Sequence, residues 1–147
     1  MAKQSQNVAA NAAKLTNKLT MKREIKFRGK RCLGGIWIFG DLLHNVETGQ
    51  VAVAKCKREN NFAEFDVIPE TVGQFTGLHD KTGKEIYEGD LIELPFGEKV
   101  AHEVIFRRGR FSLKRGDVSH ALCIYHNDSY IVGNIHDNPE LMKGVEQ

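Results

Sequence analysis

The stretch FTGLHDKTGKEIYEGDLIEL, residues 75–94, decides how the centre of the chain folds. The segment GLHDKTGK within it resembles a phosphate-binding loop, which has the pattern G-x-x-x-x-G-K-[ST] between a buried strand and a helix. Here Gly77 and Gly83 are one residue too far apart, and Glu85 occupies the place of the magnesium-binding hydroxyl. The residues that follow alternate as a strand rather than a helix. We therefore reject a phosphate-binding loop.

The same stretch predicts a tight turn and then a sharply bent strand. Asp80 can initiate a turn through its carboxylate, and Gly83 suits a position that needs positive φ. Gly89 allows a bend, and the carboxylate of Asp90 can accept hydrogen bonds from backbone N–H groups there. The alternative role of Asp90, as a base or a metal ligand, has no evident partner in the sequence. These residues favour a structural role for the stretch.

The composition indicates one soluble globular domain. Of the 147 residues, 41% are hydrophobic and 27% are charged, which is enough for one modest core but not for two. No apolar run reaches the ~20 residues of a membrane helix, and the N-terminus lacks the apolar region of a secretory signal. We therefore expect a cytoplasmic protein in which Cys32, Cys56 and Cys123 stay reduced.

Alternating hydrophobicity predicts about eight short strands with little helix between them. Strands are expected within residues 23–29, 34–43, 50–56 and 85–94, on both sides of Gly109, and on both sides of residues 126–129. Residues 57–64 are polar and predict a loop. Pro69 should break regular pairing, and Asn138 should cap a short helix that begins at Pro139. The expected fold class is mainly β (α+β): a small antiparallel β-barrel of SH3-like type or packed sheets, with short terminal helices.

The chain divides into an N-terminal helical extension, residues 1–20, and a β domain, residues 21–147. A thin apolar stripe at helical spacing marks the extension: Val8, Ala12, Leu15 and Leu19. A helix this short and this weakly apolar is marginal alone. It should fray, or become ordered by docking onto the β domain or onto a neighbouring subunit.

Two groups of basic residues are candidate ligand-binding residues: Arg23, Lys26 and Arg28 near the start of the β domain, and Arg107, Arg108 and Arg110 near Gly109. The first group can contact phosphates, or it can belong to a solvated helix and a lysine-protected edge strand. The second lies beside Phe106 and Phe111, and cations with interleaved aromatic rings can bind nucleic acid. Alternatively, strict alternation sends the phenylalanines into the core and the arginines into water.

No pattern of residues predicts catalysis, a cofactor or a metal site. The six histidines lack the short regular spacing of zinc ligands, and no C-x-x-C pair is present. No G-x-S-x-G elbow surrounds a nucleophile. We expect no catalytic residues, no metal and no cofactor, and a small hydrolase that uses His and Asp groups is the third choice of function.

Four segments of the β domain resemble the YopX-like proteins of phages and prophages: MKREIKFRGKR, GIWIFGDL, IPETVGQFTGLHDKTGKEIYEGDLIEL and YIVGNIHDNPEL. The resemblance extends from about Met21 to Leu141. It implies a predominantly β fold, a tendency to self-associate and no assigned biochemical activity, so no catalytic residues carry over. The matching positions are mostly of the types found in turns and caps: Gly77, Asp80, Gly83, Gly89, Asp90, Gly133, Asn134 and Pro139.

These observations predict a phage or prophage accessory protein without enzymatic activity, acting by binding in the bacterial host cytoplasm as a homo-oligomer. Its partner would be a host protein or a small nucleotide signal, with the basic residues named above contacting phosphates. The alternative is a nucleic-acid-binding protein in phage replication or transcription, with binding that depends strongly on salt. No membrane partner is expected.

Overall fold

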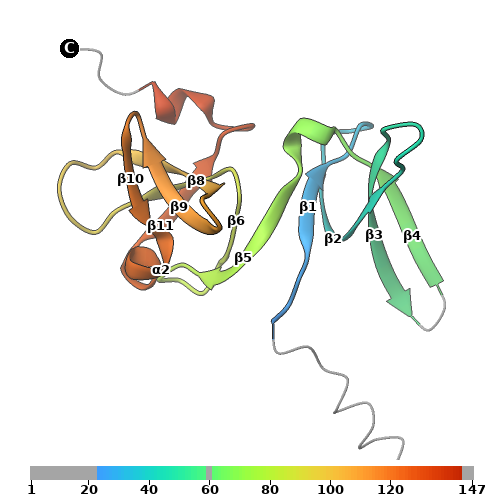
Figure 1. Cartoon of the computed structure of the whole chain (residues 1–147), viewed down its shortest axis with the longest axis horizontal. Helices are drawn as coiled ribbons and strands as arrows, with labels where there is room; N and C mark the ends of the chain where they lie inside the picture. Colours follow the sequence, from blue (N-terminus) through green and yellow to red (C-terminus); the bar gives the residue numbers. More distant parts are fainter. Residues whose placement is uncertain (1–22, 59–60, 144–147) are drawn as a thin grey trace, which may run out of the picture.

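The computed structural model describes residues 23–58 and 61–143, except for the side chains of residues 56–58. The helical extension expected over residues 1–20 lies outside the described residues. Two antiparallel sheets make up most of the structure, and Figure 1 shows two lobes side by side. In the described part of the chain, no helix has the length and apolar character needed to cross a membrane.

The first sheet has six strands in the order β4-β3-β2-β1-β5-β6. Its strands are β1 (Phe27–Lys30), β2 (Trp37–His44), β3 (Val51–Arg58), β4 (Asn61–Asp66), β5 (Gly73–His79) and β6 (Glu85–Tyr87). From β1 to β4 each strand pairs with the next along the chain. We call residues 27–67 the N-terminal lobe. Its buried centre is small and includes Val53 and Val67.

The second sheet has five strands in the order β10-β9-β8-β7-β11. Its strands are β7 (Asp90–Glu93), β8 (Ala101–Arg107), β9 (Arg110–Arg115), β10 (Val118–Ala121) and β11 (Tyr130–Asn134). The short helix α2 (Leu122–Tyr125) and the 3-10 turn η2 (His126–Asp128) connect β10 to β11, and the 3-10 turn η3 (Pro139–Met142) follows β11. We call residues 85–142 the C-terminal lobe.

The main core lies on one face of the second sheet. It consists of Ile86, Ile92, Leu94, Val104, Leu113 and Leu122. Val104 and Leu113 are cross-strand partners, and the alternation of β8 and β9 directs their sequence neighbours to the other face. Each fully buried Leu or Ile stabilises the fold by roughly 1.5–3 kcal/mol relative to an exposed one. The C-terminal lobe therefore carries most of the hydrophobic stabilisation.

Strand β5 belongs to both lobes. Gly73 and Gln74 pair with β1, whereas Phe75 and His79 pair with β6. The 3-10 turn η1 (Pro69–Thr71) precedes β5, so Pro69 interrupts the pairing as expected. Because one continuous strand is hydrogen-bonded to each lobe in turn, it fixes where the lobes lie relative to one another (Figure 1).

The expectation of a mainly β fold with packed sheets is confirmed, but the barrel alternative is wrong. Neither sheet closes on itself, and the outer strands are β4 and β6 in one sheet and β10 and β11 in the other. An isolated bridge between Arg31 and Val67 brings the segment after β4 back to the end of β1 without closing the sheet.

Three local expectations are also wrong. Residues 57–58 end β3 and residues 61–64 form most of β4, where a loop was expected, because pairing between these strands outweighs the polar composition. The strand expected just before residues 126–129 ends at Ala121, and α2 follows because Leu122 turns into the core. Asn138 makes no side-chain cap to η3; its Oδ1 accepts the N–H of Asn134 at 3.4 Å instead.

Candidate ligand-binding sites

The turn at the centre of the chain is structural. Gly83 N–H donates to the carbonyl of Asp80 at 2.9 Å, and Gly83 has a φ of +85°, which its lack of a side chain allows. The carboxylate of Asp80 accepts hydrogen bonds from Thr82 and Lys84 at one oxygen and from the N–H of Ile131 at the other. Burial alone raises the pKa of Asp80, but these hydrogen bonds lower it overall. The carboxylate thus ties the turn to β11.

Asp90 also has the predicted structural contact. Gly89 has a φ of +81°, and the chain bends there. Oδ2 of Asp90 accepts the N–H of Tyr87 at 2.7 Å. The prediction that this carboxylate accepts turn N–H groups is confirmed. Its other oxygen, Oδ1, lies 2.6 Å from Nη1 of Arg28 on β1, in the other lobe.

The remaining positions of the resemblance also lie at turns and close approaches. Gly77 lies in the irregular part of the β5–β6 pairing. The side-chain oxygen of Asn134 accepts the N–H groups of His136 and Asp137 at 3.0 and 2.9 Å, which shapes the turn after β11. A Cβ on Gly133 would lie 2.5 Å from Oδ1 of Asn138, so only glycine leaves room for that side chain.

Arg28 lies at the centre of the contact between the lobes. It is 7% exposed, pairs with Asp90, and donates from Nη2 to the carbonyl of Glu88 at 3.1 Å. Its guanidinium also lies over the rings of Trp37 and Tyr87, at 4.7 and 5.2 Å from their centroids. Burial raises the pKa of Asp90, and the charge of Arg28 opposes that rise. Arg28 therefore serves the contact between the lobes, and we do not include it in a ligand site.

Two lysines reinforce this contact on either side of Arg28. Lys26 pairs with Glu24 at 3.0 Å and with Glu85 of the C-terminal lobe at 2.5 Å. Lys30 pairs with Asp137 at 2.6 Å, and the other oxygen of Asp137 accepts Nε1–H of Trp37 at 2.7 Å. Lys26 is thus also engaged within the protein. The sequence analysis missed the Lys30–Trp37–Asp137 contact, since no local pattern joins residues 100 positions apart.

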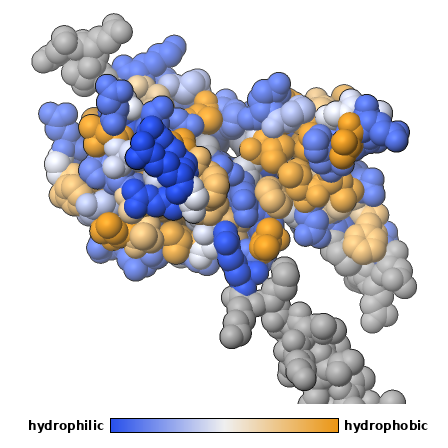
Figure 2. Space-filling model, in the orientation of Figure 1, coloured by the Kyte–Doolittle hydropathy of each residue, from blue (hydrophilic) through white to orange (hydrophobic). Residues whose placement is uncertain are grey.

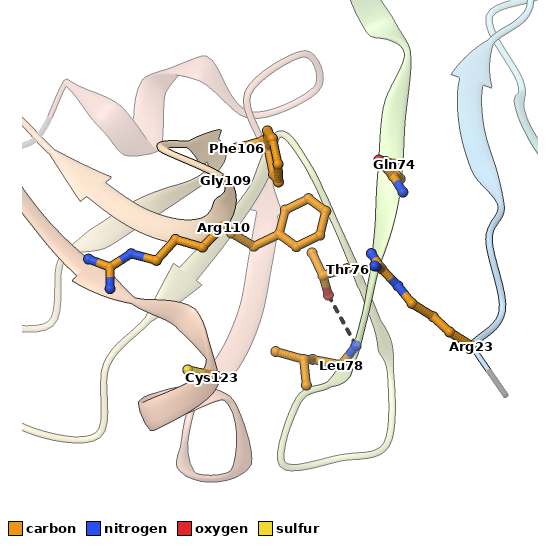
Figure 3. A pocket seen from close by; sticks show the side chains of 9 residues that line it. Arg23, Gln74, Thr76, Leu78, Phe106, Gly109, Arg110 and Cys123 are labelled. Carbon is orange, nitrogen blue, oxygen red and sulfur yellow. Dashed lines mark hydrogen bonds between the residues drawn. The ribbon is translucent and has the colours of Figure 1, made fainter.

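A groove of about 450 Å³ runs between β5 and the β8–β9 hairpin. It is lined by Arg23, Gln74, Thr76, Leu78, Phe106, Gly109, Arg110, Phe111 and Cys123. Phe106 and Phe111 pack edge to face with centroids 5.1 Å apart, and Phe106 is 56% exposed. Figure 3 shows the ring of Phe106 facing the groove and the guanidinium of Arg23 directed at β5 near Thr76. An apolar wall therefore faces a cation across the groove.

Arg107 and Arg110 lie on the opposite face of the hairpin from Phe106 and Phe111, as strict alternation implied. Arg107 and Arg110 are cross-strand partners, and the adjacent pair Phe106 and Phe111 has the other orientation. Figure 3 shows the side chain of Arg110 extending away from the groove. Both phenylalanines line the groove, and Phe111, which is partly buried, also packs against the main core. This arrangement does not place interleaved cations and rings on one nucleic-acid-binding surface.

The other titratable groups do not converge on a reactive centre. Among the described residues, no group of three or more His, Cys, Asp or Glu side chains could hold a metal ion. Burial lowers the pKa values of His102 and His136, which favours their neutral forms. Burial and the neighbouring carboxylate of Glu85 raise the pKa of Tyr87 well above its usual value. Cys32 and Cys123 are exposed free thiols.

Comparisons with known proteins agree with this architecture. A family model described as YopX protein matches residues 26–143. In a search of curated proteins, no protein matches. Among solved structures, the chain is similar to protein EF1440 from Enterococcus faecalis, known from a crystal structure, with 24% sequence identity and a TM-score of 0.55. The match covers 82% of this chain and 99% of that chain, and at this identity it concerns the fold alone.

Proposed function

This chain belongs to the YopX protein family, and from that premise we propose that it is a non-enzymatic binding protein whose groove holds a small ligand with an aromatic ring and a negative charge. A nucleotide is the ligand class with this chemistry. The observation that carries the proposal is the placement of the Phe106–Phe111 pair opposite Arg23. The ring of a nucleobase would stack on the exposed phenylalanine, and Arg23 would pair with the phosphate.

The size and chemistry of the groove support this ligand class. Small-molecule sites commonly enclose about 300–1,000 Å³, with mostly apolar walls and a few polar groups that orient the ligand. The groove of about 450 Å³ has three apolar side chains and the polar groups of Gln74 and Thr76 on its walls. Within the described residues, none of the ion pairs involves Arg23, so its charge is available to a ligand.

We further propose that the protein is a phage or prophage accessory protein that acts in the host cytoplasm as a homo-oligomer. Membership of the YopX family and the resemblance to phage proteins support the first part. The exposed apolar side chains of the N-terminal lobe, with Phe39 and Phe62 among them, and its open edge strand β4 support self-association. A host protein bound at such a surface is the alternative partner.

Native mass spectrometry of the purified full chain tests both parts at once. We expect a mass corresponding to two or more copies, with a retained small molecule of nucleotide mass. A monomer would refute self-association. A protein that retains nothing and that binds no nucleoside monophosphate or cyclic nucleotide at ~1 mM would refute the ligand proposal, since that affinity amounts to only about 4 kcal/mol.

Matched variants locate the bound nucleotide. Phe106→Ala removes the exposed ring, and because stacking contributes about 1–3 kcal/mol per base, binding should weaken roughly 5- to 160-fold. Its control is Phe96→Ala, which removes a similarly exposed ring that packs on Tyr125 outside the groove. Arg23→Gln should weaken the binding of nucleotides but not the binding of the corresponding nucleoside, which lacks the phosphate. Lys99→Gln, which also removes one positive charge, is its control. Equal effects in a variant and its control would contradict the assignment.

A further inference from the structure

The outer face of the β8–β9 hairpin carries a second hollow, on the side opposite the groove. It measures about 140 Å³ and is lined by Arg107, Arg108, Arg110, Ser112 and Ser119. Strand register explains the gathering: Arg107 pairs with Arg110, and Ser112 and Ser119 project to the same side from β9 and β10. Ser112 is 2% exposed, so it lies at the floor, beneath the arginines. Figure 2 shows the most hydrophilic colour gathered over this hairpin.

The backbone at the hairpin tip is unusual for the residue it carries. Arg108 has a φ of +52° and is the only residue other than glycine with positive φ in the described part of the chain. With Gly109 at +76°, it forms a two-residue hairpin turn in which Asn or Asp is the usual first residue. Arginine in this conformation costs free energy, and such strain recurs at functional sites. The strained turn adds a third guanidinium to the hollow.

The three arginines lack counter-charges in the part of the chain that the structure describes. None of the ion pairs found among the described residues includes Arg107, Arg108 or Arg110. Three neighbouring guanidinium groups repel one another, and a bound anion would relieve this repulsion while accepting several charge-assisted hydrogen bonds. The planar fork of arginine matches the oxygens of a phosphate, and serine hydroxyls can donate to the oxygens that remain.

We propose that this hollow is a binding site for one phosphoryl group, separate from the groove. Its volume is below the roughly 300 Å³ at which sites for whole small molecules begin, so it suits a single anionic group rather than a complete nucleotide. The three arginines that line the hollow contact the phosphoryl oxygens, and the hydroxyls of Ser112 and Ser119 contact the same group from the sheet. The site does not depend on the groove, because Phe106 and Phe111 project from the opposite face.

The test uses the full chain labelled with ¹⁵N and titrated with tripolyphosphate at constant ionic strength. The backbone amides of Arg108, Gly109, Ser112 and Ser119 should shift together, with saturation in the millimolar range or below. Sodium chloride at matched ionic strength should leave them unmoved. If the amides respond equally to both salts, or the largest shifts lie elsewhere, the hollow is not a phosphate site.

Arg108→Asn separates binding from folding. Asparagine is favoured at this turn position, so the variant should fold with an equal or higher melting temperature. Its affinity for tripolyphosphate should fall at least about tenfold, because a charge-assisted contact is lost. Lys99→Asn, in an exposed loop of the same lobe, is the control for lost charge and should retain the affinity. Unchanged binding by Arg108→Asn would overturn the proposal.

Two further titrations identify the source of the phosphoryl group. A short single-stranded oligonucleotide is compared with and without a 5′-phosphate, alongside a free nucleoside triphosphate. Preference for terminal phosphates, on the triphosphate or the 5′ end, assigns the site to phosphate monoesters. Equal binding of both oligonucleotides, with a steep salt dependence, assigns it to the nucleic-acid backbone. If neither tripolyphosphate nor any other phosphate ligand shifts the backbone amide resonances of the hairpin, the proposal is refuted. That result would not bear on the nucleotide proposed for the groove.

Discussion

The two lobes of this protein bury different amounts of apolar surface. Nine hydrophobic side chains of the C-terminal lobe are buried: Ile86, Tyr87, Leu91, Ile92, Leu94, Ala101, Val104, Leu113 and Leu122. Among the described side chains of the N-terminal lobe only three hydrophobic ones are buried: Val53, Ala54 and Val67. Phe39, Leu43 and Phe62 stay exposed there, and Figure 2 shows hydrophobic colour over this lobe. A sheet with so little buried surface is marginal alone.

The N-terminal lobe therefore depends for its stability on contacts with the rest of the molecule. Its links to the rest of the molecule include the β1–β5 pairing and the polar contacts of Lys26, Arg28 and Lys30. The C-terminal lobe has its own core, so the dependence runs in one direction. We therefore expect the N-terminal lobe to exchange its amide hydrogens faster and to lose structure whenever the contact between the lobes is weakened.

The largest expected effect comes from breaking the ion pair at the centre of that contact. Asp90→Asn leaves the guanidinium of Arg28 buried without its counter-charge, which typically costs about 3–5 kcal/mol. Urea denaturation should show this loss, and hydrogen exchange should show faster opening throughout β1–β4. Asp41→Asn, at an exposed site of β2, is the matched control. A loss below about 1 kcal/mol would mean that the pair does not hold the lobes together.

Truncating one core side chain in each lobe should have the next largest effect and tests whether the dependence runs in one direction. Leu113→Ala should lower the free energy of unfolding by about 2–5 kcal/mol, because it removes a fully buried side chain from the main core. Val53→Ala should cost about 2 kcal/mol, since fewer carbons are removed. Hydrogen exchange should then show both lobes opening in the first variant and only β1–β4 in the second. Opening of both lobes to the same extent in the two variants would refute the one-way dependence.

The smallest expected effect is a dependence on pH at the edge of the contact. Hydrogen bonds from Asn134, Lys30 and Trp37 lower the pKa of Asp137 below its usual value. Because the unfolded chain then binds more protons, this contribution is present above about pH 4 and is lost as the pH falls further. Asp137 is partly exposed, so the contribution should be about 1 kcal/mol or less.

The urea midpoints of the protein and of the Asp137→Asn variant are measured from neutral pH to about pH 3. The fluorescence of Trp37, the single tryptophan, monitors unfolding. The two midpoints should converge as the pH falls. Asp80 and Glu85, whose pKa values are also lowered, lose their contributions in both proteins, so only the difference reports on Asp137. A gap that stays constant or widens towards low pH would show that the sign is wrong.

Turn chemistry and strand alternation were predictable from the residues themselves. The turn at Asp80 and Gly83, the bend at Gly89 and the hairpin at Gly109 follow from side chains and backbone conformations that act over a few residues. Strand β4 and helix α2 were not predictable, because partners from elsewhere in the chain decided them. The alternation of the hairpin also separated its arginines from its phenylalanines.

The mainly β character, the turns and the family follow from the residues alone, since these depend on short-range patterns in the chain. Which of the basic residues form ion pairs within the protein follows only from the arrangement of the strands in space. Lys26 and Arg28 meet carboxylates from Glu85 and Asp90, nearly 60 residues or more along the chain, and are used to join the lobes. Arg23, Arg107, Arg108 and Arg110 form no ion pair with a carboxylate among the described residues. The physical reason is that charge pairing depends on distances in space, which the order of residues does not specify.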